Sequence, residues 1–291
     1  MRRLICAFAL FSLSLNASWK EHLESKKSVI NESAYRLLTA QHELHVKNDA
    51  PKIVDPRVKT IPIIESNEPL VDVNASNHAR ISMLPNPTHP FASADCNSGF
   101  TASSKIRRSV FVKLQGLVNQ LDTLAPHFGY QAGQIHIKVF EGLRDLKTQE
   151  MLFTNKAHEI QQANPSMSEE EAFAETCKWV SPVRNNIPVH STGAAVDIRL
   201  WDIKNNQFID MGPFGVIWGK NTTAPTFSAD LTEEQINNRL LLLAAAAQAG
   251  LVNYTYEWWH FSHGDRYASF WQEADASKRS AIYDAVKNSK L

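Results

Sequence analysis

The sequence predicts an α+β fold, with a small antiparallel sheet flanked by helices in one compact domain. Apolar residues recur at helical spacing over residues 103–127, and again after a capping box at 232–235. Between these helices, residues 135–140 and 194–200 alternate in polarity and are rich in β-branched residues, as expected for strands. The late strands are close in sequence, and short connections favour antiparallel pairing.

The composition excludes two classes of partner. The chain has 291 residues, with 30 basic and 30 acidic side chains and a formal net charge of zero. A chain without a broad cationic field does not attract nucleic acid or an anionic membrane surface. We therefore expect neither nucleic acid nor a stable membrane partner. A hydrophobic content of 43% is typical of an ordinary globular protein with a substantial core.

Residues 1–17 have the pattern of a signal peptide. Arg2 and Arg3 form a short basic region, and the apolar run that follows over 4–15 is too short to span a bilayer as a helix. We expect cleavage after Ala17 and export to the periplasm or the cell exterior. A retained anchor or a buried N-terminal helix would fit the same run.

Residues 18–50 are polar and charged, and they carry no chemical motif. They predict an N-terminal extension that is mobile or helical, with a helix-forming patch over 32–45. Three prolines between 51 and 62 then predict an extended linker in which helix is disfavoured. The main domain is expected over residues 51–285.

Within this domain the predicted elements follow a mixed order. They are a strand at 70–73, a loop at 85–97, a helix over 103–127 ended by Gly129, a strand at 135–140, a helix over 148–163, a helix from the capping box at 168–171 through Trp179, a strand at 194–200, and an apolar helix from the capping box at 232–235 through Ala249, ended by Gly250.

Three cysteines are present, at Cys6, Cys96 and Cys177. Cys6 would leave with the signal peptide. An exported compartment permits a disulfide between the other two, but two separate buried thiols fit equally well. Neither lies in a CxxC pair or beside a His/Asp cluster, so we do not assign them to a metal.

The first motif that carries chemistry is Val189-His190-Ser191-Thr192-Gly193-Ala194-Ala195-Val196-Asp197. In a strand over 194–200, Val196 and its apolar alternates face the core and Asp197 faces the other side. Gly193 and its small neighbours allow a turn that returns His190 to the side of Asp197. Taken alone, this pattern fits a solvent-facing carboxylate on a half-exposed strand better than it fits a functional site.

The second motif is Glu257-Trp258-Trp259-His260, within an aromatic-rich segment. Such surroundings predict partial burial of Glu257 and His260, and a buried charge needs a partner because its isolated burial is expensive. On a straight strand these two residues would face opposite ways. For both side chains to reach one site, the chain must turn there.

Together the two motifs predict a hydrolase with one Zn²⁺ per chain. His190, Asp197 and His260 supply three protein ligands and leave a fourth position for water, whose pKa zinc lowers towards about 7. Glu257 is then free to accept the water proton as a general base and to deliver it to a leaving amine.

The oxyanion of such a reaction needs a further donor, and Arg144 is the candidate. It follows the predicted strand at 135–140 within Glu141-Gly142-Leu143-Arg144. Losing a donor of this kind typically costs about 3 kcal/mol of transition-state stabilisation. A surface ion pair with Asp145 or Glu141 would also explain Arg144, and sequence alone favours that explanation.

The motifs resemble those of the D-alanyl-D-alanine dipeptidase family, which are VanX-type zinc peptidases of the LAS group. Residues 189–198 are similar to the family's H-x-x-G-x-A-x-D element, and residues 257–261 to its E-x-W-H element. The resemblance implies His190, Asp197 and His260 as zinc ligands, Glu257 as the catalytic base and Arg144 as the transition-state arginine. It extends weakly over residues 68–275 and implies a compact α+β domain around a small antiparallel sheet.

The implied activity is zinc-dependent hydrolysis of the peptide bond of D-alanyl-D-alanine, a small cell-wall dipeptide. We expect the zinc site to lie in a small central cleft lined in part by Trp258 or Trp259.

Two departures from the family pattern keep a second hypothesis open. Pro188 stands where the family usually has a serine, and residues 211–215 lack the aspartate that helps to hold a free amine, since Asp210 precedes the turn. Both favour a D,D-carboxypeptidase or endopeptidase that trims peptidoglycan stem peptides. A non-catalytic, zinc-stabilised binding module is a third possibility, although a structural zinc would not need Glu257. A general secreted hydrolase of esters or amides is a fourth, which the assignment of Arg144 disfavours.

Overall fold

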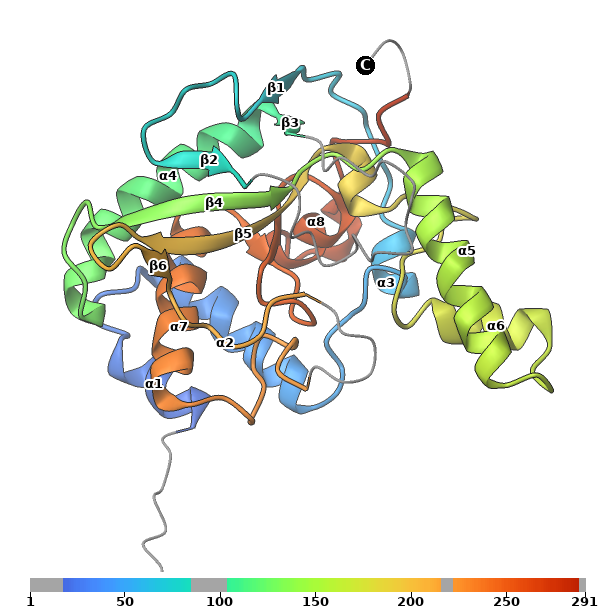
Figure 1. Cartoon of the computed structure of the whole chain (residues 1–291), viewed down its shortest axis with the longest axis horizontal. Helices are drawn as coiled ribbons and strands as arrows, with labels where there is room; N and C mark the ends of the chain where they lie inside the picture. Colours follow the sequence, from blue (N-terminus) through green and yellow to red (C-terminus); the bar gives the residue numbers. More distant parts are fainter. Residues whose placement is uncertain (1–17, 85–103, 216–221, 288–291) are drawn as a thin grey trace, which may run out of the picture.

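The computed structural model describes residues 18–84, 104–215 and 222–287, and its fold is α+β as predicted (Figure 1). The α-helices are α1 (Trp19–Ser25), α2 (Glu32–Val46), α3 (Pro56–Lys59), α4 (Arg108–Leu124), α5 (Leu146–Ala163), α6 (Glu169–Thr176), α7 (Glu233–Gln248) and α8 (Arg266–Gln272). The strands are β1 (Leu70–Asp72), β2 (Ile81–Met83), β3 (Lys105–Arg107), β4 (Ile135–Glu141), β5 (Ala195–Asp202), β6 (Gln207–Phe208), β7 (Val252–Asn253) and β8 (His260–Ser262). Short 3-10 turns are η1 (Ala125–Phe128), η2 (Val189–Thr192) and η3 (Ala276–Lys278).

The main sheet has the strand order β2-β4-β5-β8-β7, and β6 pairs with β5. The pairs β4–β5, β5–β8 and β7–β8 are antiparallel, as expected for strands with short connections. The pair β2–β4 is parallel, which the sequence did not predict. The chain between these two strands includes α4, and a long crossover of this kind is what parallel pairing requires.

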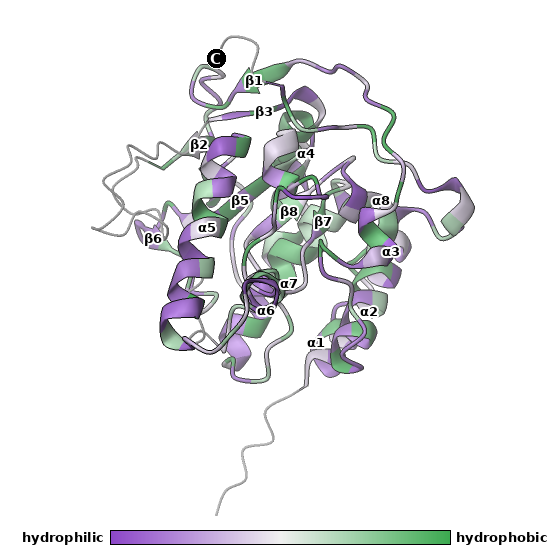
Figure 2. Ribbon diagram, turned by 90° about the vertical axis from the view of Figure 1, so that its right-hand side faces the viewer, coloured by the Kyte–Doolittle hydropathy of each residue, from purple (hydrophilic) through white to green (hydrophobic). Residues whose placement is uncertain are grey.

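The core lies between this sheet and the helices α4 and α7, which run behind the sheet in Figure 1. Alternate apolar residues of β4 and β5 enter the core, as the strand pattern predicted. Figure 2 shows α7 as a largely hydrophobic helix inside the molecule, whereas α5 and α6 carry long hydrophilic stretches. The helix α7 is therefore the central support of the sheet, and α5 and α6 form a more solvent-exposed unit.

Several helix ends lie where the sequence placed them. Ser168 and Thr232 form the predicted capping boxes of α6 and α7. Gly129 and Gly250 follow η1 and α7 in the left-handed region, with φ of 90° and 82°. The helix predicted over 103–127 begins only at Arg108, because the preceding residues form β3, and α6 ends at Thr176 rather than near Trp179.

Residues 18–50 form α1 and α2, which pack on α7 and contribute to the main core. The Trp19 indole Nε1 donates to Ser228 O (3.1 Å), and Gln41 Nε2 donates to Asn253 O (2.9 Å). The following linker contains the short helix α3, which Asp55 caps and Pro56 begins. Proline is tolerated there because the first helical N–H needs no partner within the helix.

The expected signal peptide (1–17), the expected loop at 85–97 and Cys96 lie outside the described residues. Cys177 forms no disulfide with any residue of the described part. Over residues 18–84, 104–215 and 222–287, no helix combines the length and the apolar character needed to cross a membrane.

Candidate metal centre and cleft

Three polar residues of the site are neighbours across three strands. Asp197 on β5 is paired in register with His260 on β8 and, on its other side, with Glu141 on β4. The register of β4 shifts between Val139 and Glu141, so a local irregularity brings Glu141 into this row. All three side chains are buried. The sheet therefore places a carboxylate, an imidazole and a second carboxylate side by side.

His190 reaches the same place from the turn η2, as the sequence predicted. The turn ends at Gly193, whose φ of 71° lies in the left-handed region. A Cβ at this glycine would come within 2.8 Å of Leu70 Cδ2. Gly193 is therefore required for both its conformation and its lack of a side chain, and it returns the chain from η2 into β5.

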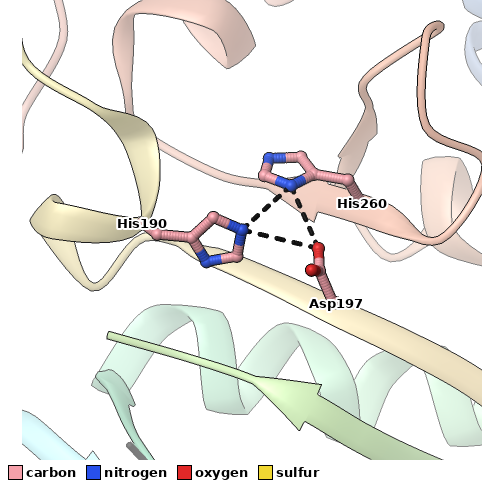
Figure 3. A group of neighbouring side chains, drawn as sticks. All are labelled: His190, Asp197 and His260. Atoms are coloured by element: carbon pink, nitrogen blue, oxygen red, sulfur yellow. Dashed lines mark hydrogen bonds and ion pairs between the residues drawn. The ribbon is translucent and has the colours of Figure 1, made fainter. Parts of the chain in front are cut away.

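The side chains of His190, Asp197 and His260 converge on one point (Figure 3). His260 Nδ1 lies 3.0 Å from Asp197 Oδ1 and 3.1 Å from His190 Nε2, and His190 Nε2 lies 3.5 Å from Asp197 Oδ1. One potential ligand atom from each residue thus lies within 4.8 Å of the others. Among the described residues, this is the group of His, Cys, Asp and Glu side chains that could hold a metal ion.

The hydrogen bonds around these residues fit a bound cation. His190 Nδ1 lies 2.9 Å from the carbonyl oxygen of Gly142, which can accept only from an N–H. His190 Nε2 therefore presents its lone pair to the centre, the arrangement typical of a metal-bound histidine. Asp197 Oδ1 is buried and receives no hydrogen bond from the described residues. A cation bound among the three residues would accept the lone pair of His190 Nε2 and neutralise the charge on Asp197 Oδ1.

The electrostatics of Asp197 agree with this arrangement. Burial alone would raise the pKa of Asp197, but His190 and His260 hold that pKa well below its ordinary value. Asp197 is therefore an anion throughout the physiological range, as a metal-binding carboxylate must be.

Glu257 lies beside this group without belonging to it. The chain turns between Glu257 and His260, where the His260 N–H donates to Glu257 O (3.1 Å), and β8 begins at His260. This turn, which the sequence predicted, brings Glu257 Oε2 to 3.7 Å from His260 Nδ1. Burial raises the pKa of Glu257 to about 7, and neighbouring His260 opposes the shift. A carboxylate with such a pKa suits proton transfer near neutral pH.

Arg144 is buried at the end of β4 and lines the cleft. Its Nε donates to Glu141 Oε1 (2.7 Å), its Nη2 donates to Glu141 Oε2, and its Nη1 donates to Gln149 Oε1 (2.8 Å). The sequence favoured an ion pair of Arg144 at the surface. The pair with Glu141 is present, but it is buried, so the predicted surface position is wrong. Asp145 is not its partner, since that side chain caps α5.

The site residues form the inner part of a cleft of about 430 Å³. The cleft is also lined by the segment 52–54, before α3, by residues 177–181, after α6, and by parts of α5. The aromatic residues Tyr254, Tyr256 and Trp179 also line it. The central cleft is present as expected, but its walls come from segments in which the sequence had indicated no site residue.

Trp258 and Trp259 do not line this cleft. Both side chains are buried in the main core, and Trp258 Nε1 donates to Pro213 O (3.1 Å). Residues 258–259 form a turn rather than a strand, so the two indoles do not point to opposite sides of a sheet. The expectation that they contact substrate is therefore corrected, and Tyr254 and Tyr256 are the aromatic residues of this segment that line the cleft.

The two departures from the family pattern, at Pro188 and near residues 211–215, differ in their relation to the cleft. Pro188 lines the cleft two residues before His190. Asp210 is exposed and lies outside the cleft lining, where its Oδ1 accepts from the Gly212 N–H (2.9 Å) and its Oδ2 accepts from Gln235 (3.1 Å). Asp210 therefore does not replace the missing acid.

Comparisons with known proteins show what this chain is similar to. Residues 133–276 match the family model described as D-ala-D-ala dipeptidase. A D-alanyl-D-alanine dipeptidase of Synechocystis sp. is 29% identical over 225 residues, which cover 71% of this chain and 86% of that protein.

Two solved structures are similar at 13% identity. One is a variant of the vancomycin-resistance D,D-pentapeptidase VanY in complex with Zn(II), with a TM-score of 0.33 over 60% of this chain and 82% of that chain. The other is VanYB in complex with D-alanine-D-alanine, with a TM-score of 0.34 over 60% of this chain and 85% of that chain. The match over residues 133–276 contains every residue of the candidate metal centre, and over this range the chain is similar to the D-ala-D-ala dipeptidase family.

Proposed function

We propose that this protein is a zinc-dependent peptidase that hydrolyses the peptide bond of D-alanyl-D-alanine. The observation that carries the proposal is the convergence of His190, Asp197 and His260, with Glu257 beside them, at the inner end of a cleft. Two imidazoles and one carboxylate are a donor set that zinc enzymes use when one position is left for water. We also propose that the protein is exported and acts on cell-wall peptides.

His190, Asp197 and His260 would hold one zinc ion. When bound, the ion supplies a Lewis acid that acidifies a water molecule and polarises the scissile carbonyl. Glu257 accepts a proton from the attacking water as the water oxygen bonds to the carbonyl carbon. It then delivers that proton to the amine nitrogen as the C–N bond breaks. The pKa near 7 of this carboxyl suits it to both transfers.

Arg144 stabilises the negative charge that develops on the carbonyl oxygen. Its guanidinium is fixed by Glu141 and Gln149, so little reorganisation is needed at the moment of reaction. Glu141 is a positioning residue in this scheme. The Arg144 N–H also donates to His190 O (3.2 Å), which couples the arginine segment to the turn η2.

A second candidate activity is D,D-carboxypeptidase or endopeptidase cleavage of peptidoglycan stem peptides. Its specific support is the cleft, whose volume of about 430 Å³ lies within the range of about 300–1,000 Å³ that accommodates ligands of drug size. Such a cleft has room beyond a dipeptide. No acid stands at the place where the family holds a free amine, which is consistent with a longer substrate.

The test is D-alanine release by the purified, zinc-loaded protein from D-Ala-D-Ala and from a stem pentapeptide with the same terminus. Release from the dipeptide supports the dipeptidase, and release from the pentapeptide alone supports the second candidate. Absence of release from both peptides contradicts the proposed function.

Two variants test the roles within the site. Glu257→Gln should retain zinc and lose turnover, whereas His190→Ala should lose zinc. Loss of zinc from the Glu257→Gln variant would mean that Glu257 is a ligand.

A further inference from the structure

The outer end of the cleft carries a cation that the mechanism does not use. Lys52 lines the cleft from the segment before α3, outside the part of the chain that matches the family model. The same cleft contains Glu257 and His260 at its inner end. A substrate bound at the metal centre therefore shares one continuous space with Lys52.

The surroundings of Lys52 hold its ammonium group at the cleft. Its Nζ lies 5.2 Å from the centroid of the Tyr256 ring, a cation–π contact. The Tyr256 hydroxyl donates to Ala50 O (2.9 Å), which ties the ring to the segment that carries Lys52. The side chain is half-buried, and burial lowers the pKa of Lys52 from its ordinary value.

No carboxylate of the described residues lies within ion-pair distance of Lys52. Lys178, another cation of the cleft lining, is already paired with Glu175, three residues before it. Glu257, an acid of the inner site, lies beside His260 and serves the metal centre. Glu175 attracts Lys52 electrostatically but forms no ion pair with it. A half-buried ammonium that forms no ion pair is stabilised when a carboxylate binds to it.

We propose that Lys52 is a specificity residue that binds a carboxylate of the peptide substrate. This inference rests on the proposed peptidase function and adds the chemical class that the outer cleft selects. Two parts of a substrate could supply the carboxylate. One is the C-terminal α-carboxylate of the D-Ala-D-Ala unit, and the other is an acidic side chain on the N-terminal part of a longer peptide.

The experiment compares Lys52→Met with Lys52→Arg, which retains the charge. Both are made in the Glu257→Gln background so that the peptides stay intact, and affinities of the zinc-loaded proteins are measured by calorimetry. The probes are a stem pentapeptide that contains D-glutamate, its D-glutamine analogue, and both peptides with a C-terminal amide.

We expect Lys52→Met to raise the Kd of carboxylate-bearing peptides by about fivefold to tenfold, the scale of one charge-assisted hydrogen bond, and Lys52→Arg to restore most of it. If the penalty disappears with the C-terminal amides, Lys52 binds the α-carboxylate. If it disappears with D-glutamine, Lys52 binds the acidic side chain. High salt should reduce the penalty in either case.

The proposal would be overturned if each of the four peptides bound the Lys52→Met variant as tightly as it binds the protein that retains Lys52. An equal loss for the charged peptides and for the neutral peptide that lacks both carboxylates would also overturn it, because that result indicates packing rather than charge. Absence of binding to the protein that retains Lys52 would overturn it as well. Turnover of D-Ala-D-Ala by the unmodified protein is measured separately, so a failure of the peptidase function is distinguishable from a failure of the subsite.

Discussion

Arg107 should control zinc affinity although it does not reach the metal centre. This buried arginine at the end of β3 donates from Nε to Thr192 O (2.8 Å), from Nη1 to Glu68 O (2.7 Å) and from Nη2 to Asp284 O (3.3 Å). It also pairs with Glu65 at 3.3 Å. Thr192 belongs to the same turn, η2, as His190, the proposed zinc ligand. Arg107 therefore fastens this turn to segments before β1 and after α8.

Replacement by methionine keeps most of the aliphatic volume and removes every one of these side-chain bonds. Breaking a buried, hydrogen-bonded charge pair typically costs about 3–5 kcal/mol, because the remaining groups stay buried and unpaired. We expect a loss of this size in the free energy of unfolding of Arg107→Met. Residues that orient a metal ligand typically contribute about 10–100-fold to metal affinity, and we expect a decrease within that range.

The measurements are urea unfolding of the metal-free protein and zinc affinity by competition with a chelator. Arg80→Met is the matched control. Arg80 donates from Nε (3.2 Å) and Nη2 (2.7 Å) to Ile135 O and pairs with Asp122, at the end of β4 remote from Glu141. It should lose stability and retain zinc affinity. Wild-type zinc affinity in Arg107→Met, or an equal loss in Arg80→Met, would refute the positioning role.

Three further predictions concern the core, the loss of stability at acidic pH and the N-terminal helices. Trp258→Phe loses the indole hydrogen bond to Pro213 in the core and should lower stability by about 1–3 kcal/mol while KM is unchanged; a raised KM with unchanged stability would contradict the core position. Burial lowers the pKa of His263 to about 4, so the folded state binds fewer protons than the unfolded state and stability should be lost as pH falls from about 6.5 towards 4. His263→Gln should flatten the dependence of unfolding free energy on pH, and an unchanged slope would exclude His263 as the cause. Leu38→Ala should destabilise the whole protein by about 2–5 kcal/mol, since Leu38 is in the main core. Hydrogen-exchange loss confined to α2 would show instead that residues 18–50 form a separate unit.

The arrangement within each of the two motifs could be predicted because it depends on local geometry. The period of two in β5 places Asp197 opposite to the face of Val196, and the glycine after η2 allows the return of His190. The separation of Glu257 and His260 required a turn, and the chain turns there. Each inference used residues within about ten positions of one another, where backbone geometry limits the alternatives.

The role of Glu141 could not be predicted in the same way. It depends on the register between β4 and β5, which includes a shift next to Glu141. Sequence alternation does not determine where such an irregularity falls. The prediction that Trp258 or Trp259 lines the cleft failed for a related reason. The environment of these residues is set by packing against Phe214 and the rest of the core. An aromatic residue beside a catalytic motif is informative only when its backbone conformation is known.

The walls of the cleft depend on contacts between residues far apart in the sequence. Ala50 accepts from Tyr256, and Gln41 donates to Asn253, so helix α2 and the segment after it are fixed against β7 and the residues that precede Glu257. No local pattern marks Lys52 as part of a site, since its position follows from this long-range packing alone. The part of the chain that matches the family supplies the metal centre, whereas Lys52 comes from outside it. If Lys52 selects the substrate, then proteins that share the motifs at His190 and Glu257 can differ in substrate through the packing of an N-terminal segment. Changes of specificity in this family should then be sought in segments that lie against the cleft rather than in the motifs.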